Sequence, residues 1–256
     1  MRLIFSGLIF LSLFISCAGG EGSVKVKNYE LEVLAEYPHD TTSYTQGLFF
    51  HEGRMYETTG QYGESTLRQV DLVSGQPMQK QNFERRYFAE GSVIFKGNLY
   101  VLTWDSREVF VFDPQTFEKK STIRYYREGW GLTTDGNYLI ASDGSSTLFF
   151  LDEKCSLKKR ISVKHEGKLV KWLNELEYID GKIWANVYMT DQIVIINPET
   201  GNVEGVVDCR GLLPQQLRTR NTDVLNGIAY NPKSGKLYFT GKNWPRLYEV
   251  RIVEKN

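Results

Sequence analysis

The sequence predicts an all-β fold, namely a five-bladed β-propeller closed by an N-terminal strand. The first observation is a short phrase that recurs five times: a polar or aromatic residue, then Gly or Glu, then the start of an alternating apolar strand. Successive copies lie 44, 40, 44 and 52 residues apart and begin at Gln46, Glu90, Trp130, Asn174 and Asn226. A period of about 40 to 45 residues with short strands is typical of β-propellers. Two further observations are a hairpin pattern after every copy and one unpaired strand at the N-terminus.

Each phrase opens a β-hairpin. Apolar residues alternate on both sides of a turn glycine, which supplies the positive φ that such turns need. The five hairpins span Leu48–Glu57, Val93–Trp104, Leu132–Ser142, Leu176–Tyr188 and Ile228–Thr240. A third strand follows four of them and ends at a residue whose side chain can cap the next turn, namely Asp71, Asp113, Asp152 or Asn197. A fourth strand comes next, for example over Lys120–Arg124.

The strand at the N-terminus is predicted to supply the strand that the last repeat lacks. The fifth repeat stops after its third strand, Arg246–Val253, while a spare strand over Tyr29–Tyr37 precedes the first repeat. Pairing of the spare strand with the last sheet would close the ring and leave no open strand edge. The longest connection, Gly205–Leu225, has apolar residues at helical spacing over Leu212–Leu217. This pattern predicts a loop with a short helix beside the channel mouth.

Composition excludes several classes of protein. The chain has 256 residues, 41% of them hydrophobic, which is enough for a sizeable core and argues against disorder. Lys and Arg number 31, as do Asp and Glu, and the basic residues are scattered, so no footprint for nucleic acid is present. After residue 16 no apolar run is long enough to span a membrane.

The N-terminus has the pattern of an export signal. Residues 1–16 combine Arg2 with a long apolar centre, as in a secretion signal, and the segment ends in Ser16-Cys17, which resembles a bacterial lipobox with Phe14 in place of the usual Leu. If Cys17 is lipidated, residues 17–28 form a tether. Residues 29–256 are predicted to form a single propeller domain. The protein would then be exported, in the periplasm or on the outer membrane of a bacterium, and touch membrane only through its lipid anchor. Cleavage near Ala18 and an uncleaved anchor are the alternatives.

Histidine and cysteine are too sparse for several kinds of chemistry. The three histidines, His39, His51 and His165, have no second ligand at metal spacing, so we expect no metal site, no Ser-His-Asp relay and no cofactor. The loop Gly60–Glu64 follows a strand and is not a phosphate loop, which would precede a helix. In an oxidising compartment Cys155 and Cys209 could form a disulfide, but two free thiols are at least as compatible with the sequence.

The recurring phrase brings its opening residues together at one mouth of the channel. There one carboxylate, Glu90, lies among amides and aromatic rings: Gln46, Asn174, Asn226 and Trp130. The ends of the paired strands add Trp104, Tyr188 and Lys242. Desolvation beside indole rings should raise the pKa of Glu90, which suits a group that takes up and returns a proton near neutral pH.

Each of these residues also has a purely structural interpretation. Glu90 could cap the turn before Gly91, and Lys242 could lie in a solvated turn. Trp104 and Trp130 could be core packing, as we expect for the three remaining tryptophans, Trp172, Trp184 and Trp244.

A resemblance favours the functional interpretation. Eight motifs are similar, in order and spacing, to those of the plant and bacterial type of glutaminyl-peptide cyclotransferase. They are Tyr44-Thr45-Gln46-Gly47-Leu48, Ala89-Glu90-Gly91, Leu102-Thr103-Trp104, Gly129-Trp130-Gly131-Leu132-Thr133, Leu173-Asn174-Glu175-Leu176-Glu177-Tyr178, Asn186-Val187-Tyr188, Val224-Leu225-Asn226-Gly227-Ile228-Ala229 and Thr240-Gly241-Lys242-Asn243-Trp244-Pro245. The chain departs from the family at Tyr44, where Phe is usual, and at Tyr188, where Trp is usual.

The resemblance implies a five-bladed propeller that converts the N-terminal glutamine of peptides or proteins to pyroglutamate with loss of ammonia and without a catalytic metal. It implies that Glu90 transfers the proton and that Gln46, Trp104, Trp130, Asn174 and Lys242 surround the substrate. We expect Lys242 and Asn174 to donate to the developing oxyanion, and the aromatic side chains to orient the substrate. Tyr44, Tyr188 and Asn226 complete the predicted pocket, and a monomer is expected.

Two other classes of function stay open at this point. One is a non-catalytic envelope propeller that binds a peptide or glycan on an aromatic-lined mouth. The other is a lactonase or lyase that uses a central cation, for which the mouth would need several carboxylates. Glu90 and Glu175 are the only acidic residues in the repeated phrase, which disfavours the cation-dependent class.

Overall fold

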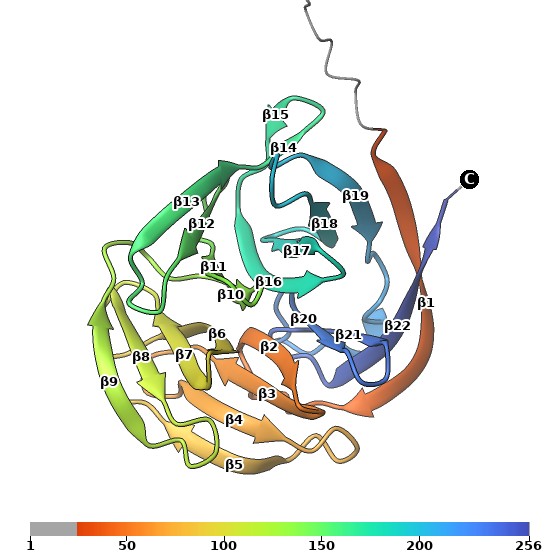
Figure 1. Cartoon of the computed structure of the whole chain (residues 1–256). Helices are drawn as coiled ribbons and strands as arrows, with labels where there is room; N and C mark the ends of the chain where they lie inside the picture. The colour runs from red at the N-terminus through yellow and green to blue at the C-terminus, as the bar shows by residue number, and fades with distance from the viewer. Residues whose placement is uncertain (1–24, 256) are drawn as a thin grey trace, which may run out of the picture.

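The computed structural model describes residues 25–255, which form an all-β fold with its sheets arranged around a common centre (Figure 1). The only helical element in this range is one turn of 3-10 helix, Gln215–Leu217. No helix in the described residues has the length and apolar character needed to cross a membrane.

Three of the sheets are four-stranded and antiparallel, with their strands in sequence order. The first contains β2 (Thr45–His51), β3 (Arg54–Thr59), β4 (Thr66–Val70) and β5 (Pro77–Asn82). The second contains β6 (Ala89–Phe95), β7 (Asn98–Thr103), β8 (Glu108–Phe112) and β9 (Lys119–Arg124). The third contains β10 (Leu132–Thr134), β11 (Leu139–Ala141), β12 (Thr147–Leu151) and β13 (Leu157–Ser162). A small hairpin of β14 (Lys164–His165) and β15 (Lys168–Leu169) follows.

The remaining strands form one eight-stranded sheet in the order β16-β17-β18-β19-β1-β22-β21-β20. Its strands are β16 (Leu173–Ile179), β17 (Lys182–Val187), β18 (Gln192–Ile196), β19 (Val203–Asp208), β20 (Leu225–Asn231), β21 (Lys236–Gly241), β22 (Arg246–Glu254) and β1 (Lys27–Pro38). The N-terminal strand β1 pairs antiparallel with β22, as the sequence predicted. It also pairs in parallel with β19, which the sequence did not indicate.

The five strands that begin with the recurring phrase lie nearest the centre, where β2, β6, β10, β16 and β20 contact their neighbours in turn (Figure 1). Burial follows this arrangement, because all seven residues of β6 are buried while β5 and β9 at the outside are almost entirely exposed. Gly91 and Gly131 show why the recurring phrase contains glycine. A Cβ at either position would lie 2.4 Å or less from the backbone of the next inner strand, at Leu132 or Asn174. Inner strands can therefore approach closely only because the side chain is missing.

The turns predicted from local sequence patterns are present in the structure. In the second hairpin Lys96 and Gly97 have φ of 47° and 75°, the two positive values of a type I′ turn. At the following turn the Asp113 carboxylate accepts the backbone N–H groups of Gln115 and Thr116 at 2.9 and 3.1 Å. Such side-chain capping satisfies turn N–H groups that have no strand partner.

The short helix predicted within the Gly205–Leu225 connection is present as a single 3-10 turn, Gln215–Leu217, which is shorter than the apolar spacing over Leu212–Leu217 suggested. Leu212 and Leu213 pack into the hydrophobic core beside Trp244, so only Gln215–Leu217 forms a helical turn. Burial in the core, rather than helix amphipathicity, accounts for these apolar residues. Cys155 and Cys209 are free thiols in different core clusters, so the optional disulfide is absent from this structure.

Candidate active site

The predicted site residues converge on one cavity of about 310 Å³ at the ends of the inner strands. This volume lies at the lower end of the range for small-molecule sites, about 300 to 1,000 Å³. Eight predicted residues line the cavity, together with three that were not predicted: Tyr44, Gln46, Glu90, Trp104, Trp130, Asn174, Tyr188 and Lys242, then Gln61, Phe88 and Trp172.

Glu90 is the buried carboxyl group of the cavity. It lies in β6 with only 5% of its surface exposed, and Gln46 donates a hydrogen bond from Nε2 to its Oε1 at 2.8 Å. Within residues 25–255 no group donates a hydrogen bond to Glu90 Oε2, and no turn N–H donates to this side chain, so Glu90 does not act as a turn cap. Burial raises the pKa of Glu90 well above its ordinary value, although the nearby Lys242 ammonium opposes this shift. Burial therefore makes Glu90 a stronger base than an exposed carboxylate, which suits a group that takes up and returns a proton.

Lys242 follows β21 and is buried, so the solvated-turn interpretation is wrong. Its Nζ lies over the Tyr44 ring at 4.7 Å and over the Tyr188 ring at 5.2 Å, within the range of cation–π contacts. Burial lowers the pKa of Lys242, while the carboxylates of Glu90 and Asp223 act in the opposite direction. The Tyr44 hydroxyl donates to Asp223 Oδ2 at 2.9 Å, which ties the residue that departs from the family pattern to the loop before β20.

Aromatic side chains form much of the remaining cavity wall. Trp130 packs edge-on against Tyr188 with ring centroids 5.7 Å apart. The indole N–H groups of Trp104 and Trp130 both donate to Glu128 Oε2, at 3.1 and 3.3 Å. A second carboxylate therefore stands at the rim, where the sequence suggested a single one. Its hydrogen bonds fix the two indole rings relative to each other.

The two predicted asparagines differ in position. Asn174 lines the cavity; its Oδ1 is buried without a partner, and its Nδ2 donates to no group of the described chain. Asn226 was predicted to bind substrate, but it lies behind Gln46 and does not line the cavity. Its Nδ2 donates to the Thr45 carbonyl at 2.8 Å and to Gln46 Oε1 at 3.4 Å. Asn226 thus orients the amide that holds Glu90.

Comparison with known proteins shows the family of this chain. A family model described as Glutamine cyclotransferase matches residues 8–252. The chain belongs to the glutamine cyclotransferase family. It is 35% identical over 261 residues to a glutaminyl-peptide cyclotransferase from Arabidopsis thaliana, covering 98% of this chain and 82% of that relative. The crystal structure of Myxococcus xanthus glutaminyl cyclase matches with a TM-score of 0.85 and 37% identity, over 91% of this chain and 100% of that one.

Three residues lining the cavity of this glutamine cyclotransferase were missed. Phe88 and Trp172 each lie two residues before a predicted site residue, Glu90 and Asn174, so their position in sequence was the available signal. Trp172 was expected to be structural like Trp184 and Trp244; the other two are buried, but Trp172 is 55% exposed. Gln61 lies in the turn between β3 and β4, where no alternating pattern in the sequence predicts the direction of its side chain.

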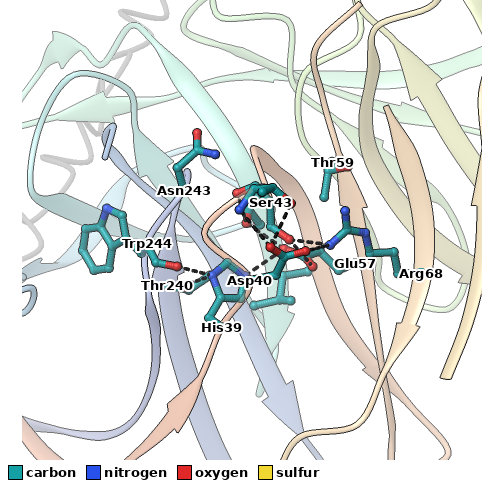
Figure 2. A network of polar contacts seen from close by, with 12 residues as sticks. His39, Asp40, Ser43, Glu57, Thr59, Arg68, Thr240, Asn243 and Trp244 are labelled. Atoms are coloured by element: carbon teal, nitrogen blue, oxygen red, sulfur yellow. Dashed lines mark hydrogen bonds and ion pairs between the residues drawn. The ribbon is translucent and has the colours of Figure 1, made fainter. Parts of the chain in front are cut away.

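A buried polar network lies behind the cavity and joins the segment before β2 to the turn after β21 (Figure 2). His39 Nδ1 faces the Trp244 carbonyl at 2.7 Å and its Nε2 faces Glu57 Oε1 at 2.9 Å. Both partners accept hydrogen bonds, and only a protonated imidazole donates twice. Burial alone would lower the pKa of His39, but the Glu57 carboxylate, the Trp244 carbonyl and Asp40 together outweigh burial, so the net pKa is raised.

The same network fixes the two segments that carry Tyr44 and Lys242. Asn243 donates its backbone N–H to the Ser43 carbonyl at 2.7 Å and its side-chain amide to the Thr41 carbonyl at 2.8 Å. The network is therefore a support for the cavity wall. Within residues 25–255, this network included, no three His, Cys, Asp or Glu side chains gather in a way that could hold a metal ion.

Proposed function

We propose that this protein is a glutaminyl-peptide cyclotransferase that converts N-terminal glutamine of peptides or proteins to pyroglutamate and releases ammonia. The single observation that carries the proposal is the buried Glu90, held by Gln46 in an aromatic-walled cavity of a chain from the glutamine cyclotransferase family. The names of the plant and bacterial relatives agree with this activity.

The reaction needs one proton to move between two nitrogens. The α-amine attacks the side-chain carbonyl carbon of glutamine, a carbon–nitrogen bond forms, and the bond to the side-chain amide nitrogen then breaks. Glu90 as a carboxylate takes the proton that the attacking amine loses and delivers it to the departing nitrogen, which leaves as ammonia. Its raised pKa suits both halves of this transfer, and Gln46 keeps the carboxyl group in place.

Charge that develops on the carbonyl oxygen needs donors that are already oriented. The Lys242 ammonium is held over two tyrosine rings, and Asn174 Nδ2 has no partner in the described chain. Each such donor typically stabilises a transition state by about 3 kcal/mol. Trp104, Trp130 and Tyr188 would hold the glutamine side chain folded back on its amine, which lowers the entropic part of the barrier.

The test is ammonia release from Gln-Gly-Ala by the purified protein, with and without exhaustive chelation. We expect turnover in both conditions, because the proposed groups are all side chains of the chain itself. Turnover that is lost on chelation and restored only by zinc would overturn metal independence. No ammonia release in either condition would favour the alternative, an envelope propeller that binds a peptide or glycan without catalysis.

We also infer that the ring consists of five blades, with β1 completing the last one. Support comes from the five inner strands that contact one another in turn and from the β1–β22 pairing. In this scheme the parallel β1–β19 contact joins two neighbouring blades into the eight-stranded sheet. Residues 29–256 would then fold as one domain and act as a monomer, which light scattering can test.

Export with lipidation is a separate proposal that rests on residues outside the described part of the chain. Residues 1–16 would be removed and Cys17 acylated, leaving 17–28 as the tether of a periplasmic or outer-membrane-anchored lipoprotein. Cys17→Ala should block processing or release the protein from the membrane fraction. Unchanged membrane partition would indicate an uncleaved anchor.

A further inference from the structure

Trp172 is the most exposed residue of the cavity wall, at 55% of its surface, whereas Glu90 at the bottom is 5% exposed. A single exposed aromatic residue is ordinary on a protein surface. Its backbone conformation is not ordinary, because Trp172 has a φ of 65°. That left-handed conformation is unfavourable for a bulky side chain, and Gly or Asn adopts it more easily.

The backbone of Trp172 is nevertheless firmly held. Its N–H donates to the Gly144 carbonyl at 2.8 Å, and its own carbonyl accepts the N–H of Tyr188 at 2.8 Å. Gly144 in turn lies directly against the Trp130 indole, since a Cβ there would come within 2.7 Å of that ring. Trp172 is therefore anchored to both neighbouring parts of the wall while most of its side chain stays in solvent. A retained strain of this kind indicates a role for the side chain itself.

The two indoles form a continuous apolar surface from the cavity to its rim. Trp130 and Trp172 have ring centroids 6.3 Å apart and planes inclined by 37°. A peptide whose first residue reaches Glu90 must leave the cavity past this rim, because the peptide bond continues outward. Trp172 is the lining residue that reaches furthest into solvent, so it is the surface available to the side chain of the second residue.

We propose that Trp172, together with Trp130, forms a subsite for the second residue of the substrate and favours aromatic or large apolar side chains there. The inference rests on the proposed cyclotransferase function and adds a determinant of substrate choice. Stacking against an indole adds to the stabilisation that an aromatic side chain gains from the apolar area it buries there. An aromatic second residue should therefore raise kcat/KM about tenfold over glycine, since 1.4 kcal/mol corresponds to a factor of ten.

The experiment compares kcat/KM for ammonia release from Gln-Phe-Ala and Gln-Gly-Ala. We expect Trp172→Ala to reduce the Phe-to-Gly preference to within about twofold through KM, because the lost contact is the same in ground state and transition state. Trp172→Phe should keep most of the preference. Leu169→Ala is the matched control, because Leu169 is equally exposed at 55% and lies outside the cavity.

A second variant separates selectivity from folding. Trp172→Gly relieves the left-handed strain, so it should be more stable than Trp172→Ala while it loses the preference to the same degree. The subsite is refuted if the parent shows no Phe-to-Gly preference, or if Trp172→Ala retains it, or if Leu169→Ala lowers it as much. A parent that releases ammonia from neither peptide would instead refute the proposed function.

Discussion

Replacing Glu90 by Gln tests the proton transfer with the least structural change. Gln46 Nε2 donates to Glu90 Oε1 at 2.8 Å, and the amide oxygen of a Gln at position 90 can accept the same hydrogen bond. Because burial disfavours the carboxylate, as its raised pKa shows, the neutral amide should not weaken the fold at neutral pH. The substitution thus removes the base and leaves shape, volume and burial nearly unchanged.

The expected loss follows from the role assigned to Glu90. General acid–base catalysis contributes about 10² to 10⁴ in rate, which corresponds to roughly 3 to 5 kcal/mol of activation free energy. We expect kcat for ammonia release from Gln-Gly-Ala to fall by this factor while KM changes by less than about threefold, because a proton-transfer group acts mainly in the transition state.

Glu177→Gln is the matched control for this loss. Glu177 is also a buried carboxyl group with a raised pKa, but it does not line the cavity. Its replacement should leave kcat within about threefold. If a folded Glu90→Gln protein kept kcat within about tenfold of the parent, or if Glu177→Gln lost as much, Glu90 would not be the proton carrier.

Three further predictions concern charge. Lys242→Ala should lower kcat by about 10² to 10³, and should move the acidic limb of the kcat/KM profile to higher pH, because removal of this cation raises the pKa of Glu90 further. The pKa of Glu177 is raised by burial to about 8 from 4.5, so this group lowers the stability of the parent as pH rises from 4.5 to 8, by at most about 5 kcal/mol. Melting curves of Glu177→Gln should show a smaller loss than the parent, with the remainder due to other buried carboxyl groups such as Glu90. An equal loss in the two proteins would contradict the assignment. Glu57→Gln leaves the buried His39 without its counter-ion and should cost about 3 to 5 kcal/mol. The cost should be largest between pH 4.5 and 6.5, where both partners are charged, and smaller at higher pH as His39 deprotonates. A melting temperature unchanged near pH 5.5 would refute the ion pair.

Much of the fold was predictable because its signals are local. Alternating apolar residues and a turn glycine act within a single hairpin, so Val93–Trp104 and its Gly97 turn could be placed from the sequence. Asp113 was identified as a turn cap in the same way, since a short side chain reaches only its own turn. The recurring phrase also carried the register of the inner strands, and thereby brought Glu90 and Gln46 to one cavity.

The sequence by itself determined which strands form, which residues open each repeat, and that a carboxyl group lies among amides and aromatic rings. Tertiary structure alone decided that Asn226 lies behind Gln46, that Lys242 is buried, and that Trp172 points its ring to solvent. Lys242 follows β21 and Trp172 precedes β16, while Asn226 lies in β20 at the register shift between Leu225 and Ile228. At such positions neither regular alternation nor a helical period fixes the direction of a side chain. Direction there is set by contacts with segments far away in sequence, such as the Gly144 carbonyl that holds Trp172, and no local pattern encodes such contacts.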